Sequence, residues 1–429
     1  MSRTSDLSSL ISPLAGSVSS VTDVYYPGDP DYLEAISHWA SSSTELSACA
    51  VVPGTAADVG IIVKSGGYSS NPGFSSTIGV HIWLTRLSEV TYDPASQTVV
   101  IGAGLIWDDV YAALQPFNVT VAGGRTTGQG VGGHILGGGY SYLTNQYGLT
   151  VDTVTAFELV RPDGQVVTVT QASDPDLEEE TTLSGVVTRF TLQTFPPGQV
   201  WGGSIQFAAS SVPNATAALL NFNANVVDPK ASVVTSYNFA LGALEESFSD
   251  GIFDEFLAIP YSTRDISTRS FLSLVQSGSV LSYTPEILEM LLYETTSWEP
   301  RLARKGGLVV SYTAQPSLPS MYTHNTQTTA FPPNRSLSLQ PFDIYAAWTV
   351  ESFDEYYHQA VKASMIRISN AAVALGQTAL VGAPVVHPNY AMYDTPLADM
   401  YGDNLPALRN LKFAVDPQNV MRLSGGFKF

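Results

Sequence analysis

AGGRTTGQGVGGHILGGGYSYLTNQYG, residues 122–148, is the stretch that decides the fold. It contains ten glycines and a single cation, Arg125. Glycine in a fixed backbone costs conformational entropy, so a run this dense indicates positive φ angles or a close approach to a ligand. The stretch predicts a site for a large, flat or phosphate-bearing cofactor. The alternative is a glycine-rich strand, loop and strand in a β domain.

Gly128, Gly130 and Gly133 form a G-x-G-x-x-G pattern, which is typical of Rossmann dinucleotide sites when a helix follows. Here a second glycine run, Gly137–Gly139, follows the pattern. We therefore expect no amphipathic helix before Asp152, the acidic residue near the required spacing. No Lys-Ser or Lys-Thr pair follows either, which excludes a P-loop.

Length and charge limit the classes of protein that fit. The 429 residues suggest two or three domain-sized units. Asp and Glu number 38 against 19 Lys and Arg, and a net charge of -19 repels phosphate backbones and anionic lipids. We expect no nucleic-acid partner, no membrane span and no metal site. The single cysteine, Cys49, rules out an internal disulfide, and its apolar neighbours predict a buried thiol.

Hydrophobic periodicity predicts the main elements. We expect helices near residues 32–39, 106–117, 286–303 and 353–375, and strands near 231–241, 305–313 and 342–350. In the second helix, Val110, Leu114 and Phe117 share one side. Turns at Asp93-Pro94 and Asp163-Gly164 predict two hairpins.

Several segments resemble one family in order and spacing. They are residues 65–114, 130–170 and 184–196, followed by HPNYAMYDTPLADMYGDN (387–404) and VDPQNVMRLSGGFKF (415–429). The chain resembles the FAD-linked oxidases with a vanillyl-alcohol-oxidase-type (PCMH-type) flavin domain. Within them it is similar to the fungal subtype of the berberine-bridge-enzyme-like branch. The resemblance covers nearly the whole chain from Tyr25 onward.

The resemblance implies an α+β fold with a split flavin domain. It consists of a PCMH-type FAD-binding domain of two α+β subdomains and a substrate domain in which helices flank an antiparallel sheet. The implied units are residues 1–42 (N-terminal extension and helix), 43–198 (FAD-binding domain), 199–386 (substrate domain) and 387–429 (C-terminal segment returning to the FAD-binding domain).

The resemblance also implies the residues of the site. Tyr390 is the candidate base, with Asn389 and Tyr393 beside it in the catalytic group. The implied cofactor contacts are Ser65, Gly66, Gly67, Tyr68, Thr126, Gly130, Gly132, Gly133, His134, Gly138, Gly139, Tyr147, Gly185, Val187, Tyr401 and Asn404. From the residues alone, His134 and each tyrosine also fit a purely structural role.

Two departures from the family concern its covalent links to flavin. Tyr68 stands where the family usually has a histidine bonded to the flavin, and Thr126 stands where doubly linked members have a cysteine. We therefore expect FAD to be held without a covalent bond. Tyr68 remains able to stack on the ring.

Two further departures concern the shape of the flavin domain. Only Thr55 to Val63 separate Pro53 from Lys64, too few residues for the family's helix and strand together. At 174–187 the family has a glycine-rich loop around the cofactor diphosphate, whereas this chain has Glu178, Glu179 and Glu180, which also fit a solvated acidic turn. Fewer backbone N–H groups around the diphosphate predict weakened FAD binding.

The function that the resemblance implies is FAD-dependent oxidation of an alcohol group on a sugar or small secondary metabolite, with oxygen as electron acceptor. A tyrosine base needs a neighbouring cation to lower its pKa from about 10. The alternative is a relative that kept the fold and lost the flavin. We expect a monomer. The resemblance implies secretion, but residues 1–20 lack the apolar core of a signal peptide, which leaves a cytoplasmic protein as the other possibility.

Overall fold

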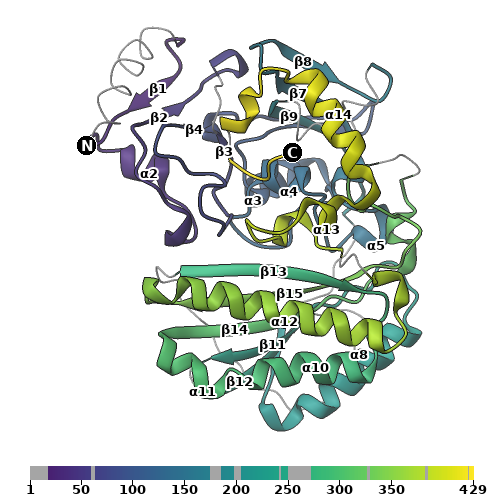
Figure 1. Ribbon diagram of the computed structural model, residues 1–429. Helices are drawn as coiled ribbons and strands as arrows, with labels where there is room; N and C mark the ends of the chain where they lie inside the picture. Colours follow the sequence, from purple (N-terminus) through teal and green to yellow (C-terminus); the bar gives the residue numbers. More distant parts are fainter. Residues whose placement is uncertain are drawn as a thin grey trace.

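The computed structural model of the chain describes residues 18–58, 63–173, 185–197, 204–240, 243–249, 272–325, 329–381, 385–423 and 425–429. Its elements form two stacked parts (Figure 1). The upper part holds a four-stranded and a five-stranded sheet, and the lower part holds a six-stranded sheet with its helices. This is the α+β fold that the sequence predicts.

The four-stranded sheet has the order β1-β2-β4-β3, with β1 antiparallel to β2 and the other pairs parallel. Its strands are β1 (Asp23–Tyr25), β2 (Cys49–Val52), β3 (Val63–Lys64) and β4 (Val80–Trp83). Helix α2 (Tyr32–Ile36) packs on it through Tyr32, Ala35 and Ile36, as the periodicity predicts. The Cys49 thiol is buried, which confirms the prediction for that residue.

The short connection between Pro53 and Lys64 retains a strand. Its described residues form one 3-10 turn, Ala56–Asp58, and then β3, which pairs in parallel with β4. Residues 59–62 lie outside the described part. Because a helix of two turns needs about seven residues, the family's helix is the element for which this connection has no room.

The five-stranded sheet is antiparallel, in the order β5-β6-β9-β7-β8. Its strands are β5 (Val90–Asp93), β6 (Thr98–Gly102), β7 (Val154–Val160), β8 (Val166–Val169) and β9 (Val186–Gln193). Both predicted hairpins are present, and Gly164 adopts the positive φ of 82° that the second turn requires. Helix α3 (Trp107–Leu114) buries Val110 and Leu114 as predicted. Phe117 is 56% exposed, contrary to expectation, because the chain leaves α3 in a 3-10 turn at Gln115–Phe117.

Helix α4 (Val131–Leu136) corrects a second expectation. The glycine runs predict no amphipathic helix between Gly128–Gly133 and Asp152, yet α4 begins inside that pattern and α5 (Thr144–Tyr147) follows it. Val131 and Ile135 are fully buried in the same core as the five-stranded sheet, so tertiary packing outweighs the low helix propensity of glycine. Gly138 (φ 101°) and Gly139 (φ 77°) then turn the chain.

The six-stranded sheet is antiparallel, in the order β10-β12-β11-β14-β15-β13. Its strands are β10 (Ser204–Phe207), β11 (Thr235–Ala240), β12 (Ala243–Ser249), β13 (Leu272–Val280), β14 (Gly307–Ala314) and β15 (Gln340–Trp348). Its helices are α8 (Val212–Asn225), α10 (Pro285–Thr296), α11 (Glu299–Leu302) and α12 (Asp354–Ala374). Helix α10 packs on β11 and β14, and α12 packs on β13 and β15.

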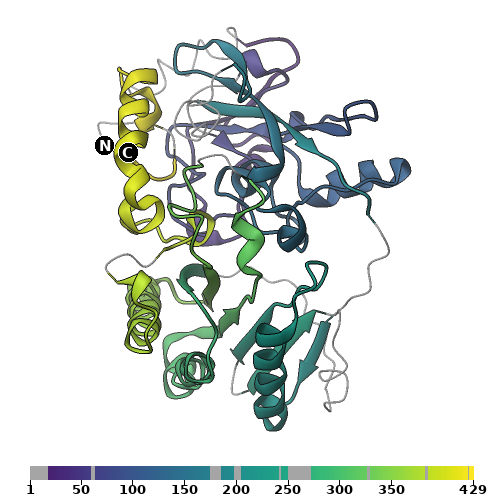
Figure 2. The same cartoon turned by 90° about the vertical axis from the view of Figure 1, so that its right-hand side faces the viewer.

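The C-terminal segment returns to the upper part. Helices α13 (Leu397–Tyr401) and α14 (Leu405–Val415) follow the six-stranded sheet, and α14 stands beside the upper sheets in Figure 2. Leu411 and Val415 pack against the core of the five-stranded sheet. The expected unit boundaries at 198 and 386 fall in or beside the undescribed residues 198–203 and 382–384, so they stay predictions.

Candidate functional site

A cavity of about 500 Å³ opens in the upper part, within the roughly 300–1,000 Å³ typical of ligand sites. Three segments of the chain form its walls: the loop after β3, the glycine-rich stretch and the C-terminal segment. The predicted cofactor residues in its lining are Ser65, Gly66, Gly67, Tyr68, Gly130, Gly132, Gly133, His134, Gly185, Val187 and Tyr401, together with Asn389 of the predicted catalytic group.

Two glycine loops meet backbone to backbone at the wall of the cavity. A Cβ on Gly66 would lie 2.6 Å from the Cα of Gly130, so neither loop tolerates a side chain there. Ser65 fixes the loops further, because its Oγ donates to the Ala103 carbonyl (2.6 Å) and accepts from the Gly132 amide (3.3 Å). The sequence predicts that these residues contact a ligand. In the structure, Ser65, Gly66, Gly130 and Gly132 also contact one another and fix the two loops together.

Gly133 differs from its neighbours. A Cβ at Gly133 would meet no protein atom within 4 Å, although Gly133 lines the cavity. Its open face therefore lets a ligand approach the backbone of α4 closely. Gly138 and Gly139 do not line the cavity. Gly139 forms the turn after α4, where a side chain has no room because its Cβ would lie 2.7 Å from the His134 ring.

His134 presents a free ring nitrogen. Its Nε2 lies 3.2 Å from the Tyr140 carbonyl, which only accepts, so Nε2 carries the hydrogen and Nδ1 has a lone pair. That Nδ1 is buried and has no partner among the described residues. Burial lowers the pKa of His134 to about 4, so the ring is neutral at pH 7.

The predicted catalytic residues lie in different surroundings. Asn389 lines the cavity and donates from Nδ2 to the His134 carbonyl (3.0 Å). Tyr390 does not line the cavity, and its hydroxyl lies 3.2 Å from Nη2 of Arg125. Tyr393 is 45% exposed and stacks on His358, with ring centroids 4.9 Å apart. Only Asn389 and Tyr390 are brought together with the glycine-rich stretch.

Arg125 is the centre of a polar cluster that sequence reasoning did not assemble. Its Nη2 also donates to Oε1 of Gln315 (2.8 Å), and Nε2 of Gln315 donates to Oδ1 of Asp343. Gln315 and Asp343 belong to the six-stranded part of the chain, so only the folded structure places them here. The one available signal was that Arg125 is the single cation of the glycine-rich stretch.

Burial and charge oppose each other at Tyr390. Burial raises the pKa of its hydroxyl above the usual value, and the charge of Arg125 offsets this rise only in part. Burial also raises the pKa of Asp343 to about 6. Arg125 is therefore the neighbouring cation that a tyrosine base requires.

Tyr68 forms part of an aromatic group at the other wall of the cavity. Its ring stacks on Trp39 with centroids 5.1 Å apart, and burial raises the pKa of its hydroxyl. Trp39 also approaches Tyr345 of β15, at 6.1 Å between centroids. Trp39 thus links Tyr68 to the six-stranded part of the molecule.

Three other predicted cofactor residues lie away from the cavity lining: Thr126, Tyr147 and Asn404. Tyr147 stacks on Phe195 at 3.7 Å, and Asn404 donates from Nδ2 to the carbonyls of Thr329 and Ala330. Contacts of these residues with a cofactor stay predictions. Glu178, Glu179 and Glu180 lie outside the described residues.

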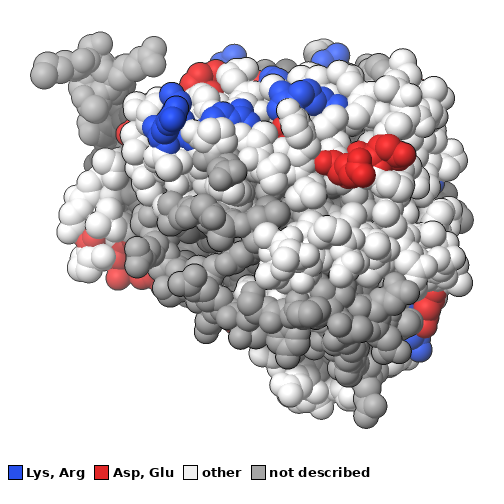
Figure 3. Space-filling view, turned by 90° about the horizontal axis from the view of Figure 1, so that it is seen from below, with Lys and Arg blue, Asp and Glu red and all other residues white. Residues whose placement is uncertain are grey.

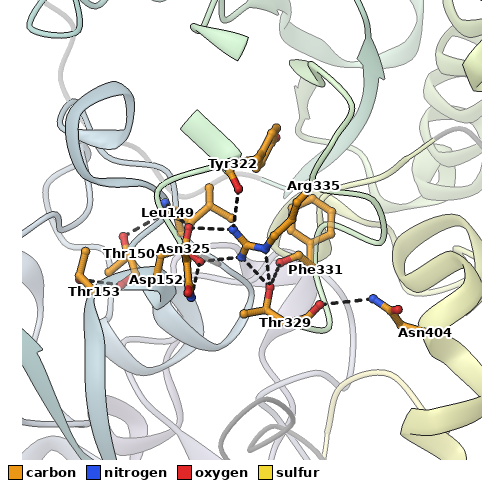
Figure 4. A network of polar contacts seen from close by, with 11 residues as sticks. Leu149, Thr150, Asp152, Thr153, Tyr322, Asn325, Thr329, Phe331, Arg335 and Asn404 are labelled. Atoms are coloured by element: carbon orange, nitrogen blue, oxygen red, sulfur yellow. Dashed lines mark hydrogen bonds and ion pairs between the residues drawn. The ribbon is translucent and has the colours of Figure 1, made fainter. Parts of the chain in front are cut away.

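Asp152, the acidic residue considered for a Rossmann site, belongs to a network between the two parts (Figure 4). Its carboxylate accepts from Nη2 of Arg335 (2.6 Å) and from the Leu149 amide (2.9 Å). The Asp152 side chain is 1% exposed and that of Arg335 is 16% exposed. Arg335 also donates to the Thr329 hydroxyl (2.6 Å), which joins this ion pair to the loop that Asn404 holds.

Residues 39–170 match the family described as FAD binding domain. Among curated proteins, the chain is 35% identical to the FAD-dependent monooxygenase drtC of Aspergillus calidoustus over 59% of this chain and 55% of that protein. It is 26% identical to the FAD-dependent monooxygenase sdcF of Emericella nidulans over 94% of this chain and 95% of that protein. In the first of these the match spans about half of the relative's length.

Solved structures show the same fold. A berberine-bridge-enzyme-like protein of Physcomitrella patens (BBE-like 1) has a TM-score of 0.74 at 18% identity, covering 96% of this chain and 97% of that one. 6-Hydroxy-D-nicotine oxidase from Arthrobacter nicotinovorans has a TM-score of 0.75 at 18% identity, covering 96% and 98%. The resemblance is thus confirmed for the FAD-binding domain and for the fold.

The residues of the cavity fit FAD on three observations. The open face of Gly133 admits a flat group, and Nδ1 of His134 is a buried acceptor that lacks a partner in the described structure. The described lining contains three Lys or Arg and no Asp or Glu, which suits a diphosphate. No group of described residues is arranged to hold a metal ion, and no described helix is long and apolar enough to cross a bilayer.

Proposed function

We propose that this chain, which carries a FAD-binding domain within a berberine-bridge-like fold, is an oxidoreductase that oxidises an alcohol group of a sugar or small secondary metabolite. Oxygen is the proposed electron acceptor. The walls of the cavity at Ser65–Tyr68 and Gly130–His134 would hold FAD. When bound, FAD supplies an acceptor for the hydride equivalent that leaves the alcohol carbon.

The observation that carries this proposal is the distance of 3.2 Å between the Tyr390 hydroxyl and Nη2 of Arg125. Removing a hydride from an alcohol carbon leaves the hydroxyl proton to be taken by a base. Tyr390 takes that proton as its phenolate, and Arg125 stabilises the phenolate charge. Burial outweighs the charge of Arg125, so the pKa of Tyr390 stays above its usual value; Arg125 offsets part of the cost of forming the buried phenolate.

Gln315 keeps Arg125 in place for this role. Its amide oxygen accepts from Arg125 and its amide nitrogen donates to Asp343, so the orientation of the amide is fixed at both ends. Its backbone N–H also donates to the Tyr283 hydroxyl (3.1 Å). The guanidinium therefore faces Tyr390 before any substrate arrives, as an electrostatic stabiliser must.

The alternative, a relative that kept the fold and lost the flavin, receives less support. A binding protein without FAD would have no reason to keep an open glycine face, an unpartnered buried acceptor and a cation-lined cavity together. The names of the relatives raise a different possibility, because a monooxygenase adds an oxygen atom to its substrate. Product mass separates the two reactions.

The test is anaerobic mixing of the FAD-loaded protein with a panel of sugars and small alcohols, followed by admission of oxygen. We expect one class to bleach the flavin, and oxygen to restore the colour with formation of peroxide. The product should be lighter than the substrate by two hydrogens. A product heavier by one oxygen would favour monooxygenation, and a protein that no alcohol bleaches would contradict the proposal.

Variants test the base. Tyr390→Phe should reduce the rate of bleaching by about 10²- to 10⁴-fold while FAD binding stays unchanged. Tyr293→Phe, on exposed α10 surface, is the matched control. Arg125→Gln should move the rising limb of the pH profile to higher pH, since it removes the cation that lowers the pKa of Tyr390. A profile that does not move would rule out this role for Arg125.

A further inference from the structure

Tyr390 lies at the end of a short 3-10 turn, Pro388–Tyr390, which His387 caps. The Asn389 amide donates to Nδ1 of the His387 ring (3.2 Å). A turn of three residues has few hydrogen bonds of its own, so it gives its last side chain little support. The contacts that hold the chain next to Tyr390 therefore decide whether its hydroxyl stays beside Arg125.

Asn71 holds the chain directly after Tyr390. Its Nδ2 donates to the Ala391 carbonyl (2.7 Å), and its Oδ1 accepts from the Tyr393 amide (3.1 Å). One side-chain amide thus pairs with a carbonyl and an N–H two residues apart, as a residue of a parallel neighbouring strand would. Asn71 is only 7% exposed, so both bonds lie in surroundings of low dielectric, where they are stronger than in water.

The loop after β3 fixes Asn71 itself. Asn71, Pro72, Gly73 and Phe74 form a turn, which a hydrogen bond from the Phe74 amide to the Asn71 carbonyl closes (3.3 Å). Gly73 has the positive φ of 72° that a type II turn requires at its third residue, after a proline at the second. The Asn71 amide also donates to Oγ of Ser69 (3.2 Å). Because Asn71 lines the proposed FAD cavity, it joins the wall of that cavity to the segment of Tyr390.

Gln276 of β13 holds the same segment from the six-stranded sheet. It is 1% exposed, and its Oε1 accepts from the Met392 amide and from the Ser277 amide (3.2 Å each). Oγ of Ser277 accepts in turn from the His387 amide (3.3 Å). Figure 1 shows β13 as the strand of this sheet nearest the upper part. Residues 391–393 are thus held by one buried amide side chain from each part of the molecule.

We propose that Asn71 and Gln276 are positioning residues for Tyr390. By holding the backbone of residues 391–393, they keep its hydroxyl beside Arg125. This inference rests on the proposed function, in which Tyr390 is the base. A base must lie within hydrogen-bond reach of the proton that it removes, and a misplacement of about 1 Å can lower the rate roughly a hundredfold. The alternative is that the two amides only join the two parts of the molecule and contribute to stability.

Fluorine NMR of the protein with FAD added tests the placement without turnover. With 3-fluorotyrosine in place of Tyr390, we expect one sharp resonance in the otherwise wild-type protein. Asn71→Ala should broaden or split it, because the ring then samples several positions. Asn71→Asp should have a smaller effect, since its carboxylate still accepts from the Tyr393 amide but repels the Ala391 carbonyl. The matched control Asn225→Ala removes a hydrogen-bonded amide at the exposed end of α8 and should leave the spectrum unchanged.

Anaerobic bleaching by the alcohol found in the panel connects the placement with the chemistry. Asn71→Ala should lower the rate by about ten- to hundredfold. In the Tyr390→Phe background the same change should alter the residual rate by less than about twofold, because no base is left to misplace. A stability role would lower both rates by the same factor. Gln276→Met should give the same pattern, and Gln276 does not line the cavity, so its variant separates positioning from direct contact with FAD.

An unchanged fluorine spectrum in both Asn71→Ala and Gln276→Met would overturn the proposal, as would equal rate losses in the two backgrounds. Where Asn71→Ala fails to fold, Asn71→Asp and Gln276→Met provide the same comparison. A dispersed fluorine signal together with normal bleaching by Tyr390→Phe would contradict only the proposed base. Slow bleaching by Tyr390→Phe together with full activity of Asn71→Ala and Gln276→Met would contradict only this inference.

Discussion

Neighbouring glycines of the glycine-rich stretch have different roles. Gly130 lies against the backbone of Gly66 and has no room for a Cβ. Gly139 has a positive φ of 77° and forms the turn after α4. Gly133 faces open space in the wall of the cavity. A substitution therefore affects loop packing, backbone strain or ligand binding according to its position.

Gly133→Val is predicted to weaken FAD binding at least tenfold without lowering the thermal unfolding midpoint. The added side chain enters the cavity and meets no protein atom within 4 Å of its Cβ, and valine is a better helix former than glycine. Fluorescence titration and calorimetry measure the two effects. Gly130→Val is the comparison, since a side chain there collides with Gly66 and should lower the midpoint. Unchanged FAD affinity in Gly133→Val would show that the ligand lies elsewhere.

Tyr68 and Thr126 predict that the flavin is bound without a covalent link. Neither side chain forms the histidyl or cysteinyl bond of the resembled family, and Tyr68 is engaged in stacking on Trp39. After acid precipitation and centrifugation, the yellow colour should remain in the supernatant. A yellow pellet would contradict the prediction.

At the scale of elements, the sequence predicts best where periodicity is strong. The hairpin at Asp163-Gly164, helix α12 and strands β11, β14 and β15 all lie where their patterns place them. Helix α4 was missed because glycine has low helix propensity and its stability comes from the buried Val131 and Ile135.

The candidate site was predictable only in part, for a similar reason. Residues of one continuous stretch, such as Gly130, Gly132, Gly133 and His134, carry a visible pattern and do line the cavity. Gln315 and Asp343 stand in ordinary strand surroundings of the sequence, and their meeting with Arg125 depends on how two domains pack. No local pattern contains that information.

The ion pair of Asp152 and Arg335 fastens the six-stranded part to the glycine-rich part. Arg335→Met should destabilise the protein by about 3–5 kcal/mol, since it leaves the buried Asp152 carboxylate without its counter-charge. Arg86→Met is the matched control: Arg86 pairs with Asp23 at the surface, where both side chains are about 40% exposed, and such pairs contribute about 1 kcal/mol or less. Denaturant unfolding compares the two. Equal losses would mean that burial does not strengthen the Asp152 pair.

For the whole molecule, the distribution of charge matters more than its sum. Among the described residues on the face seen from below, charged side chains are few, with most Lys and Arg near the upper edge and Asp and Glu in small separate groups (Figure 3). No broad basic surface is visible among the described residues of this face. Cations gather instead where the C-terminal segment meets the cavity.

Buried histidines should make the whole fold sensitive to acid. Burial lowers the pKa of His81 to about 3 and that of His134 to about 4, and it lowers the pKa of His387 as well. A histidine with a depressed folded-state pKa stabilises the fold fully above the unfolded value of about 6.5, and this stability is lost as pH falls toward the folded value. Asp343 acts in the opposite sense, because its raised pKa of about 6 favours the fold at low pH.

His81 allows the cleanest test of this balance, since it is fully buried and neither ring nitrogen has a partner among the described residues. Between pH 6.5 and 5 it should account for a loss of about 2 kcal/mol in the free energy of unfolding. The imidazole of the unfolded chain binds a proton in this range and stabilises the unfolded state, whereas the fold keeps the ring neutral. His81→Leu removes that titration, and it also removes the influence of His81 on its titratable neighbours Lys64 and His38. Denaturant unfolding at pH 7 and pH 5 should therefore show a smaller loss in the variant than in wild type. His81 lies on β4, an inner strand of the four-stranded sheet. If both proteins lose the same free energy of unfolding, burial does not keep His81 neutral and the prediction is wrong.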